Sequence, residues 1–180
     1  MTLPPLDTER LRIRPLAADD LDAAARVLDG GPPDEARRRW LEWTILAYEQ
    51  LAALYQPPYG ERAVVRREDG ALVGLVGLVP SLLPLARVTE GGPFAAHALP
   101  EVGLYWALAP EARGHGYATE AGGALARWAL EHLDLARIVA TTDHDNPASA
   151  AVMARIGMTV HRNTRGEPPW LQIVGVLERT

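Results

Sequence analysis

The stretch of sequence that decides the fold reads LAPEARGHGYA and covers residues 108–118. Its composition predicts a strand that passes through a glycine-bearing turn into a helix. Gly114 and Gly116 allow another group to approach the backbone closely, and the unpaired N–H groups of the first helical turn attract an anion. Arg113 adds a positive charge that could hold a phosphate. The stretch therefore favours a diphosphate site at this turn.

Two common phosphate-binding patterns do not fit this turn. A dinucleotide-binding turn requires a third glycine at position 119, where Thr119 stands. A kinase-type P-loop requires a lysine after its last glycine, and the chain contains no lysine. A glycine-x-glycine turn also begins many helices for geometric reasons alone, so the rest of the chain has to support the interpretation.

The residues around this turn predict an alternation of strands and helices. Hydrophobic periodicity and cap residues predict helices over 116–132 and 146–156, and strands over 101–108, 137–142, 158–162 and 170–177. Further towards the N-terminus they predict a strand near 10–14, a helix after Asp20, a second helix from 33 to about 55, and strands over 62–66 and 71–79 joined by a hairpin at Gly70.

Three features of the first hundred residues bear on a site. The second helix carries a stripe at helical spacing, formed by Trp40, Trp43, Thr44, Ala47, Leu51 and Leu54. Trp40, Trp43 and Tyr48 could instead form a wall of a substrate site, although core packing is the commoner role of such residues. Residues 80–100 are rich in proline and glycine and predict a long loop, either a functional flap or a mobile connection.

Composition limits the classes of protein to which the chain can belong. A length of 180 residues with 48% hydrophobic residues predicts one domain over 1–180. No apolar run approaches the roughly 18 residues of a membrane span, so we expect a cytoplasmic protein without a membrane partner. Because the chain has no cysteine, thiolate catalysis and cysteine-bound metals are excluded. The net charge of -5 argues against a nucleic-acid partner and suits a cationic amine.

The central motif resembles a known family. Arg113, Gly116 and Ala118 fit the Arg/Gln-x-x-Gly-x-Gly/Ala signature of the GNAT acetyltransferase superfamily. The opening at 10–15 and the segments at 146–149 and 152–158 are similar to the branch of RimJ/RimL-type N-terminal acetyltransferases of ribosomal proteins. The resemblance implies an α/β fold with a mixed sheet of about seven strands and helices on both faces, antiparallel at first. It also implies a splayed parallel pair formed by 101–108 and 137–142.

The resemblance also implies acetyl-CoA as co-substrate and no metal. In this family the backbone of the signature turn binds the CoA pyrophosphate, and the strand before it binds the pantetheine arm. The N–H of Leu108 could in addition stabilise the thioester oxyanion, a contribution worth about 100- to 1000-fold in rate elsewhere. The implied cofactor-binding residues are Leu108, Arg113, Gly114, His115, Gly116, Tyr117, Ala118, Thr119 and Asn146.

Asn146 and Ser149 each admit two roles. Asn146 followed by proline is a helix cap, and the resemblance adds a contact with CoA. Ser149 lies one helical turn later and could protonate the departing thiolate, or could simply be tolerated there. Many family members carry a tyrosine for this step seven residues after the asparagine, where Met153 stands. Ser149 or water then supplies the proton, or no acid is needed.

The resemblance places a general base near the amine, and Glu101 is our first choice, acting through water or with a raised pKa. An exposed carboxylate at a strand start is the alternative. His97, Glu90 and Tyr105 are lesser candidates. The run of potential metal ligands at 142–145 has no distant partner, and we interpret it as a polar loop.

The predicted function is transfer of an acetyl group from acetyl-CoA to a primary amine by direct attack in a ternary complex. The acceptor could be a peptide or protein N-terminal α-amine or a small amine. A non-catalytic acyl-CoA-binding regulatory protein is the alternative, motivated by Met153, and a nucleotide-binding module is a further one. An exposed sheet edge is compatible with a homodimer.

Overall fold

A computed structural model describes residues 2–89 and 97–179 of the chain. The chain forms two compact units, of which the first contains Met1–Leu78 and Tyr105–Arg127 and the second contains Val79–Leu104 and Trp128–Thr180. In the described residues eight strands are hydrogen-bonded in the order β1-β2-β3-β4-β5-β6-β8-β7. The predicted mixed α/β sheet is therefore confirmed, with one strand more than expected. That the chain is one domain stays a prediction.

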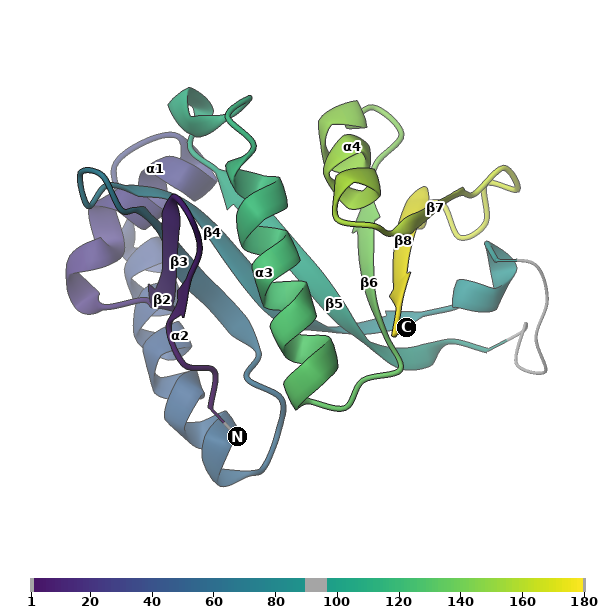
Figure 1. Cartoon of the computed structure of the whole chain (residues 1–180), viewed down its shortest axis with the longest axis horizontal. Coiled ribbons are helices and arrows are strands. Elements are labelled where there is room, and N and C mark those ends of the chain that lie inside the picture. The colour runs from purple at the N-terminus through teal and green to yellow at the C-terminus, as the bar shows by residue number, and fades with distance from the viewer. Residues whose placement is uncertain (1, 90–96, 180) are drawn as a thin grey trace. The chain divides into compact units, whose positions relative to one another are not determined.

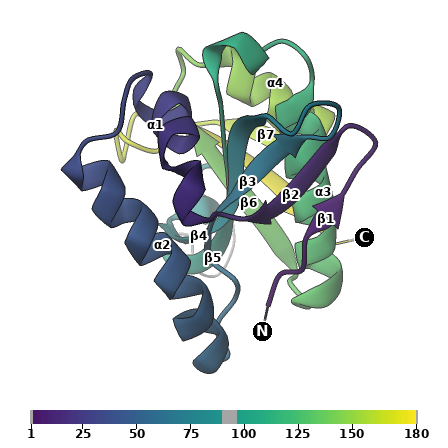
Figure 2. The ribbon, with the colours of Figure 1, turned by 90° about the vertical axis from the view of Figure 1, so that its left-hand side faces the viewer.

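The first unit is a mostly antiparallel sheet with helices on both faces. Its elements are β1 (Leu6–Asp7), β2 (Leu11–Pro15), η1 (Ala18–Asp20), α1 (Leu21–Asp29), α2 (Glu35–Ala53), β3 (Gly60–Arg66), the start of β4 (Leu72–Leu83), the end of β5 (Leu99–Leu108), η3 (Pro110–Ala112) and most of α3 (Tyr117–His132). Strand β2 pairs antiparallel with β1 and β3, and β3 pairs antiparallel with β4. Helices α1 and α2 lie on one side of β2 and β3, and α3 lies on the other (Figure 2).

Helix α2 begins as predicted, but one of its tryptophans points away from the core. Its cap is Asp34, whose carboxylate accepts a 2.8 Å hydrogen bond from the backbone N–H of Arg37. Leu41 and Thr44 are buried, whereas Trp43 is 65% and Leu54 is 66% exposed. The expectation that Trp43 packs in the core is therefore wrong. The helix carries apolar residues on two faces, so their spacing could not say which one packs.

The inner face of α2 is held by a tyrosine and a buried arginine. The Tyr48 hydroxyl donates to the backbone carbonyl of Glu61 on β3, and the Arg62 guanidinium lies 3.8 Å from the centre of the Tyr48 ring. Burial lowers the pKa of Arg62, and its Nε has no hydrogen-bond partner among the described residues. Cation–π contact therefore replaces the carboxylate that usually accompanies a buried guanidinium.

The second unit is built on β6 (Arg137–Thr142), α4 (Pro147–Arg155), β7 (Thr159–Arg162) and β8 (Ile173–Glu178), with the remaining parts of β4 and β5 and the short helix η2 (Leu85–Arg87) (Figure 1). Strand β8 pairs antiparallel with β6 and β7. Strand β5 pairs parallel with β6 through a single register pair, Gly103 with Val139. The predicted parallel pair is confirmed, and such limited pairing is what splayed strands produce.

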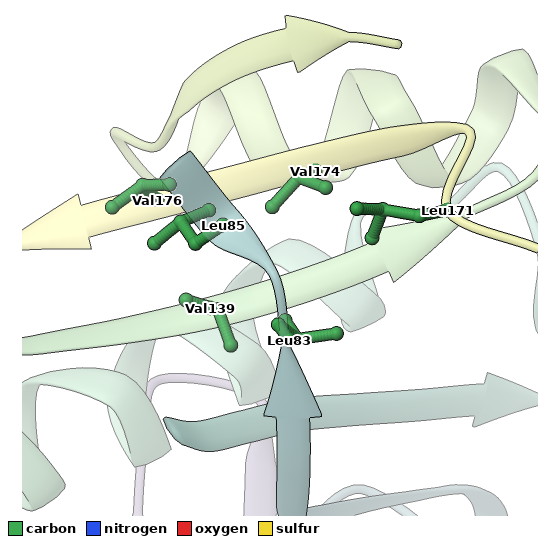
Figure 3. Close-up of a cluster of buried hydrophobic side chains, with 6 residues drawn as sticks. All are labelled: Leu83, Leu85, Val139, Leu171, Val174 and Val176. Atoms are coloured by element: carbon green, nitrogen blue, oxygen red, sulfur yellow. The ribbon is translucent and has the colours of Figure 1, made fainter. Parts of the chain in front are cut away.

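The two faces of β8 pack against different elements. One face contributes to a buried apolar cluster formed by Leu83, Leu85, Val139, Leu171, Val174 and Val176 (Figure 3). On the other face a Cβ at Gly175 would lie 3.1 Å from Cγ of Met153, which is fully buried on α4. Glycine at 175 thus allows α4 to pack closely on the strand.

The expected long loop over 80–100 is shorter than predicted. Strand β4 continues to Leu83, η2 follows, and β5 already begins at Leu99. Pro80 lies within β4 and does not end the strand. Glu90 lies outside the described residues. Over 2–89 and 97–179, no helix is long and apolar enough to cross a membrane.

Candidate functional site

The predicted phosphate-binding turn has the backbone that its glycines imply. After η3, Gly114 and Gly116 adopt φ values of +80° and +81°, and α3 begins at Tyr117. A Cβ at Gly114 would meet no atom within 4 Å, so conformation rather than space demands glycine there. Residues 113–116 are exposed, directly in front of the first turn of α3. This open turn fits a diphosphate, because helix N-termini offer N–H groups and the positive end of a dipole.

Arg10, the residue directly before β2, braces this turn. Its Nη1 donates a 3.0 Å hydrogen bond to the backbone carbonyl of His115. Its Nε and backbone N–H donate to the two carboxylate oxygens of Glu120, at 2.7 Å and 2.9 Å. The Thr8 hydroxyl adds a 2.6 Å hydrogen bond to the same carboxylate. One arginine therefore links the turn, the first turns of α3 and the N-terminal strand.

Electrostatics favour the charged form of the Glu120 carboxylate at the centre of this brace. Burial alone would raise the pKa of Glu120, but hydrogen bonds from Thr8 and Arg10 and the positive charge of Arg10 lower it overall. Glu120 therefore remains a charged acceptor for the Arg10 guanidinium near neutral pH.

Tyr117 turns its ring towards the protein. The ring is almost buried, stacks on the His115 ring with centroids 5.7 Å apart, and lies 4.9 Å from the Arg10 guanidinium carbon. The side chains of this turn thus support its shape, and its backbone remains available for a ligand.

Leu108 and Arg113 meet at the end of β5. The Nε of Arg113 donates a 3.3 Å hydrogen bond to the backbone carbonyl of Leu108. Leu108 packs directly over Gly74 of β4, where a Cβ would lie 2.4 Å from Cδ2 of Leu108 and 2.5 Å from the Ala107 carbonyl oxygen. Arg113 is exposed, and its contact with a phosphate stays a prediction.

In the second unit the predicted cap of α4 is confirmed. The side-chain oxygen of Asn146 accepts a 3.1 Å hydrogen bond from the backbone N–H of Ser149, and Pro147 is the first helical residue. The hydroxyl of Ser149 has no hydrogen-bond partner within the described part of the chain, and the side chain is half-buried. A CoA contact for Asn146 and a catalytic role for Ser149 stay predictions.

Asn146→Ala should lower the free energy of unfolding by about 1 kcal/mol, because the cap hydrogen bond is lost. Asn146→Asp should keep most of that stability, since its carboxylate can accept the same bond. Urea unfolding measures both. If the alanine and aspartate variants lost equal stability, the hydrogen bond to Ser149 would not be the source of the effect.

Met153 is a packing residue of the second unit. Its side chain is fully buried against Gly175, so position 153 faces the core. Packing on β8 favours an apolar, flexible side chain at this position.

Glu101 is held by an arginine that sequence reasoning missed. Nε and Nη2 of Arg137 donate to its two carboxylate oxygens at 3.0 Å and 2.5 Å. The Glu101 side chain is 6% exposed, and its hydrogen bond is the main reason that the pKa of Arg137 is raised. A bidentate pair fixes the carboxylate firmly and occupies both oxygens. That Glu101 is the general base stays a prediction.

The lesser base candidates differ in their surroundings. Tyr105 in the first unit is half-buried; burial raises the pKa of its hydroxyl, Glu61 raises it further and Arg37 opposes the rise. His97 is exposed. In the ranges 2–89 and 97–179, no three histidine or acidic residues are grouped so that they could hold a metal ion.

The predicted site residues are divided between the units. The first unit contains Leu108, Arg113 and residues 114–119, and the second contains Glu101, Asn146 and Ser149. Glu101 bonds to Arg137, and Asn146 bonds to Ser149. No hydrogen bond or ion pair joins these two pairs in the described part of the second unit.

The fold and the signature turn define a class of protein. Residues 10–159 match the acetyltransferase (GNAT) domain, so the chain belongs to the GNAT acetyltransferase family. Members of this family use acetyl-CoA as a co-substrate. The exposed turn at 113–116, with its two left-handed glycines, fits the diphosphate of that molecule.

Individual relatives agree with this assignment. The chain is 28% identical over 162 residues to the uncharacterized N-acetyltransferase YoaA of Bacillus subtilis, covering 86% of this chain and 82% of YoaA. An acetyltransferase from Agrobacterium tumefaciens is 27% identical, with a TM-score of 0.65 and coverage of 99% and 96%. The ribosomal-protein-S5-alanine acetyltransferase of Vibrio fischeri shares the fold, with a TM-score of 0.65, 16% identity and coverage of 97% and 95%.

Proposed function

We propose that the protein is an N-acetyltransferase that moves the acetyl group of acetyl-CoA to a primary amine. The observation that carries the proposal is the open turn at 113–116, whose shape is fixed by Arg10 and Glu120. A turn braced in this way presents its backbone N–H groups to the CoA diphosphate without reorganising on binding.

In the proposed reaction the neutral amine attacks the thioester carbonyl carbon. A C–N bond forms, the C–S bond breaks, and CoA leaves as a thiolate. The backbone N–H of Leu108 stabilises the negative oxygen, Glu101 takes the proton that the amine loses, and Ser149 or water protonates the thiolate. Because the chain has no cysteine, the acetyl group does not pass through a cysteine of the protein.

We infer that the acceptor is the α-amine of a peptide or protein N-terminus in the cytoplasm, as in the RimJ/RimL-like branch. The name of the Vibrio fischeri relative supports this inference. An α-amine has a pKa near 8, so a useful fraction is neutral at physiological pH without a strong base. A small amine is the other acceptor class to be tested.

Thiol release from acetyl-CoA, followed colorimetrically, tests the proposal. Peptides with different N-terminal residues, polyamines and aminoglycosides serve as acceptors, and the protein contributes no thiol background because it lacks cysteine. Release that depends on a peptide N-terminus supports the proposed acceptor. Acetyl-CoA binding without release for any amine would favour the non-catalytic acyl-CoA-binding protein instead.

Glu101→Gln should lower kcat by about 100- to 10,000-fold, because the neutral amide cannot take the proton that the amine loses. Arg137→Gln is the matched control, because it breaks the same ion pair and leaves the carboxylate. Both variants should be less stable, but only Glu101→Gln should lose turnover to this extent. Unchanged turnover in Glu101→Gln would make the pair purely structural.

A further inference from the structure

The outer face of α2 exposes large apolar side chains. Trp43 is 65% and Leu46 is 57% exposed, and Leu54 and Tyr55, directly after the helix, are 66% and 87% exposed. Trp43 and Leu46 are one helical turn apart and therefore lie on the same side of the helix. The inner face already packs through Leu41 and Thr44, so the outer face is a second apolar surface.

A comparison between two tryptophans of α2 shows that the exposure of Trp43 is unusual within the helix. The guanidinium carbon of Arg37 lies 4.8 Å from the centre of the Trp40 ring, and Asp29 holds that guanidinium with hydrogen bonds of 2.8 Å and 2.7 Å. No cation and no aromatic ring stacks on Trp43 in the described part of the chain. The protein thus covers one tryptophan itself and leaves the other open.

The backbone of Tyr55 has an unusual conformation. It has a φ of +55°, in the left-handed region that bulky residues rarely adopt. Glycine is the usual residue at such a helix end. A strained tyrosine with 87% exposure gains little from its own chain, so its ring is available to a partner.

The charges on the outer face of α2 are ordered along the helix. Arg38 and Arg39 lie in its first turns together with a single acidic residue, Glu35, whereas Glu42 and Glu49 follow, all of them exposed. Among the described residues the side chains of Arg38 and Arg39 make only long ionic contacts to Glu35, of 3.8 Å and 4.0 Å at the surface. Such contacts hold the arginines weakly, so they remain able to pair with another molecule.

The order of charges along α2 is complementary to that of the α2 helix of a second copy that runs in the antiparallel direction. When Trp43 of one helix lies opposite Leu46 of the other, Arg39 lies opposite Gln50 and beside Glu49. The two-fold axis repeats the same pairing at the other end of the contact. A parallel arrangement would instead place like charges together. The surface therefore prefers one relative direction of two helices.

We propose that the outer face of α2 is the contact surface of a two-fold symmetric homodimer in which two α2 helices pack antiparallel. Trp43 and Leu46 form its centre, Leu54 and Tyr55 extend it, and Arg39 pairs with Glu49 of the second copy. An anionic membrane is a poorer partner, because Glu42, Glu49 and the net charge of -5 oppose it. The proposal is independent of the acetyl transfer.

Sedimentation equilibrium over a wide range of concentration tests the proposal. The wild-type protein should approach twice the 19.5 kDa chain mass. Trp43→Ala and Leu46→Glu should each raise the dimer dissociation constant by at least about 30-fold, as central interface residues do. Trp170→Ala and Leu82→Glu are matched controls, since these residues are also exposed but lie outside α2, and both should remain dimeric.

A charge exchange tests the direction of the helices. Arg39→Glu and Glu49→Arg should each raise the dissociation constant by about 2- to 30-fold, and the double variant should restore it. Circular dichroism and thermal melting establish that each variant is folded. A wild-type monomer at every concentration would overturn the proposal, as would a dimer that Trp43→Ala and Leu46→Glu leave intact. A monomer whose Trp43→Ala variant has a raised KM for a peptide acceptor would instead assign the face to substrate binding.

Discussion

Arg10→Ala should raise the Kd for acetyl-CoA by about 10- to 100-fold. The substitution removes the hydrogen bond to the His115 carbonyl and the charged bonds to Glu120, and bonds to charged groups each contribute about 1.5–3 kcal/mol. The turn at 113–116 then samples other conformations, and binding has to order it again. Calorimetric titration with acetyl-CoA or CoA measures the change.

A matched arginine two residues further along the chain distinguishes this effect from general loss of charge. Among the described residues the Arg12 side chain makes only an exposed contact of 3.9 Å to Asp7, so Arg12→Ala should leave the Kd nearly unchanged. An acetyl thioester of pantetheine without the diphosphate should react with nearly the same KM in the wild-type protein and in Arg10→Ala. Equal rises in the Kd for acetyl-CoA in Arg10→Ala and Arg12→Ala would refute the bracing role. Equal rises in KM for acetyl-CoA and for the pantetheine thioester in Arg10→Ala would refute it as well.

Gly74→Ala should destabilise the protein and distort the end of β5. The new methyl group would lie 2.5 Å from the Ala107 carbonyl oxygen and 2.4 Å from Cδ2 of Leu108. Leu108 can change rotamer, but the carbonyl belongs to the backbone, so β5 has to move. Overpacking of this kind costs about 1–3 kcal/mol, which corresponds to a fall in Tm of roughly 2–12 °C for a protein of this size.

The same substitution should weaken acetyl-CoA binding, because Leu108 and Arg113 meet at the displaced strand end. Gly31→Ala is the control: a Cβ there would meet nothing within 4 Å, and its backbone is not left-handed. Differential scanning calorimetry with and without CoA measures stability and binding together. A Gly74→Ala protein with the Tm of Gly31→Ala would show that β4 and β5 are less closely packed than the structure describes.

Local features of the fold could be predicted from the sequence. The bounds of β6, the cap at Asn146 and the hairpin glycine at 70 depend on neighbouring residues alone, and all were predicted. The core role of Trp43 was predicted incorrectly, because apolar residues occupy two faces of α2. The continuation of β4 through Pro80 was also missed, since proline usually ends an interior strand.

The side chains that hold the site could not be predicted in the same way. Arg10 and Glu120 are 110 residues apart, and Glu101 and Arg137 are 36 residues apart. Neither pair has a local signal, because any exposed arginine could pair with any acidic residue until the fold brings two of them together. The signature turn could be recognised from the sequence, because its glycines are required by the backbone conformation of only four neighbouring residues.

The brace at Arg10 also has a consequence for the order of folding. Thr8 and Arg10 are made more than a hundred residues before their partners Glu120 and His115. Contacts at such separation form late, because a large loop has to close before they contribute any stability. The turn that we propose to bind acetyl-CoA therefore reaches its final shape only after residues 8–120 have all been made.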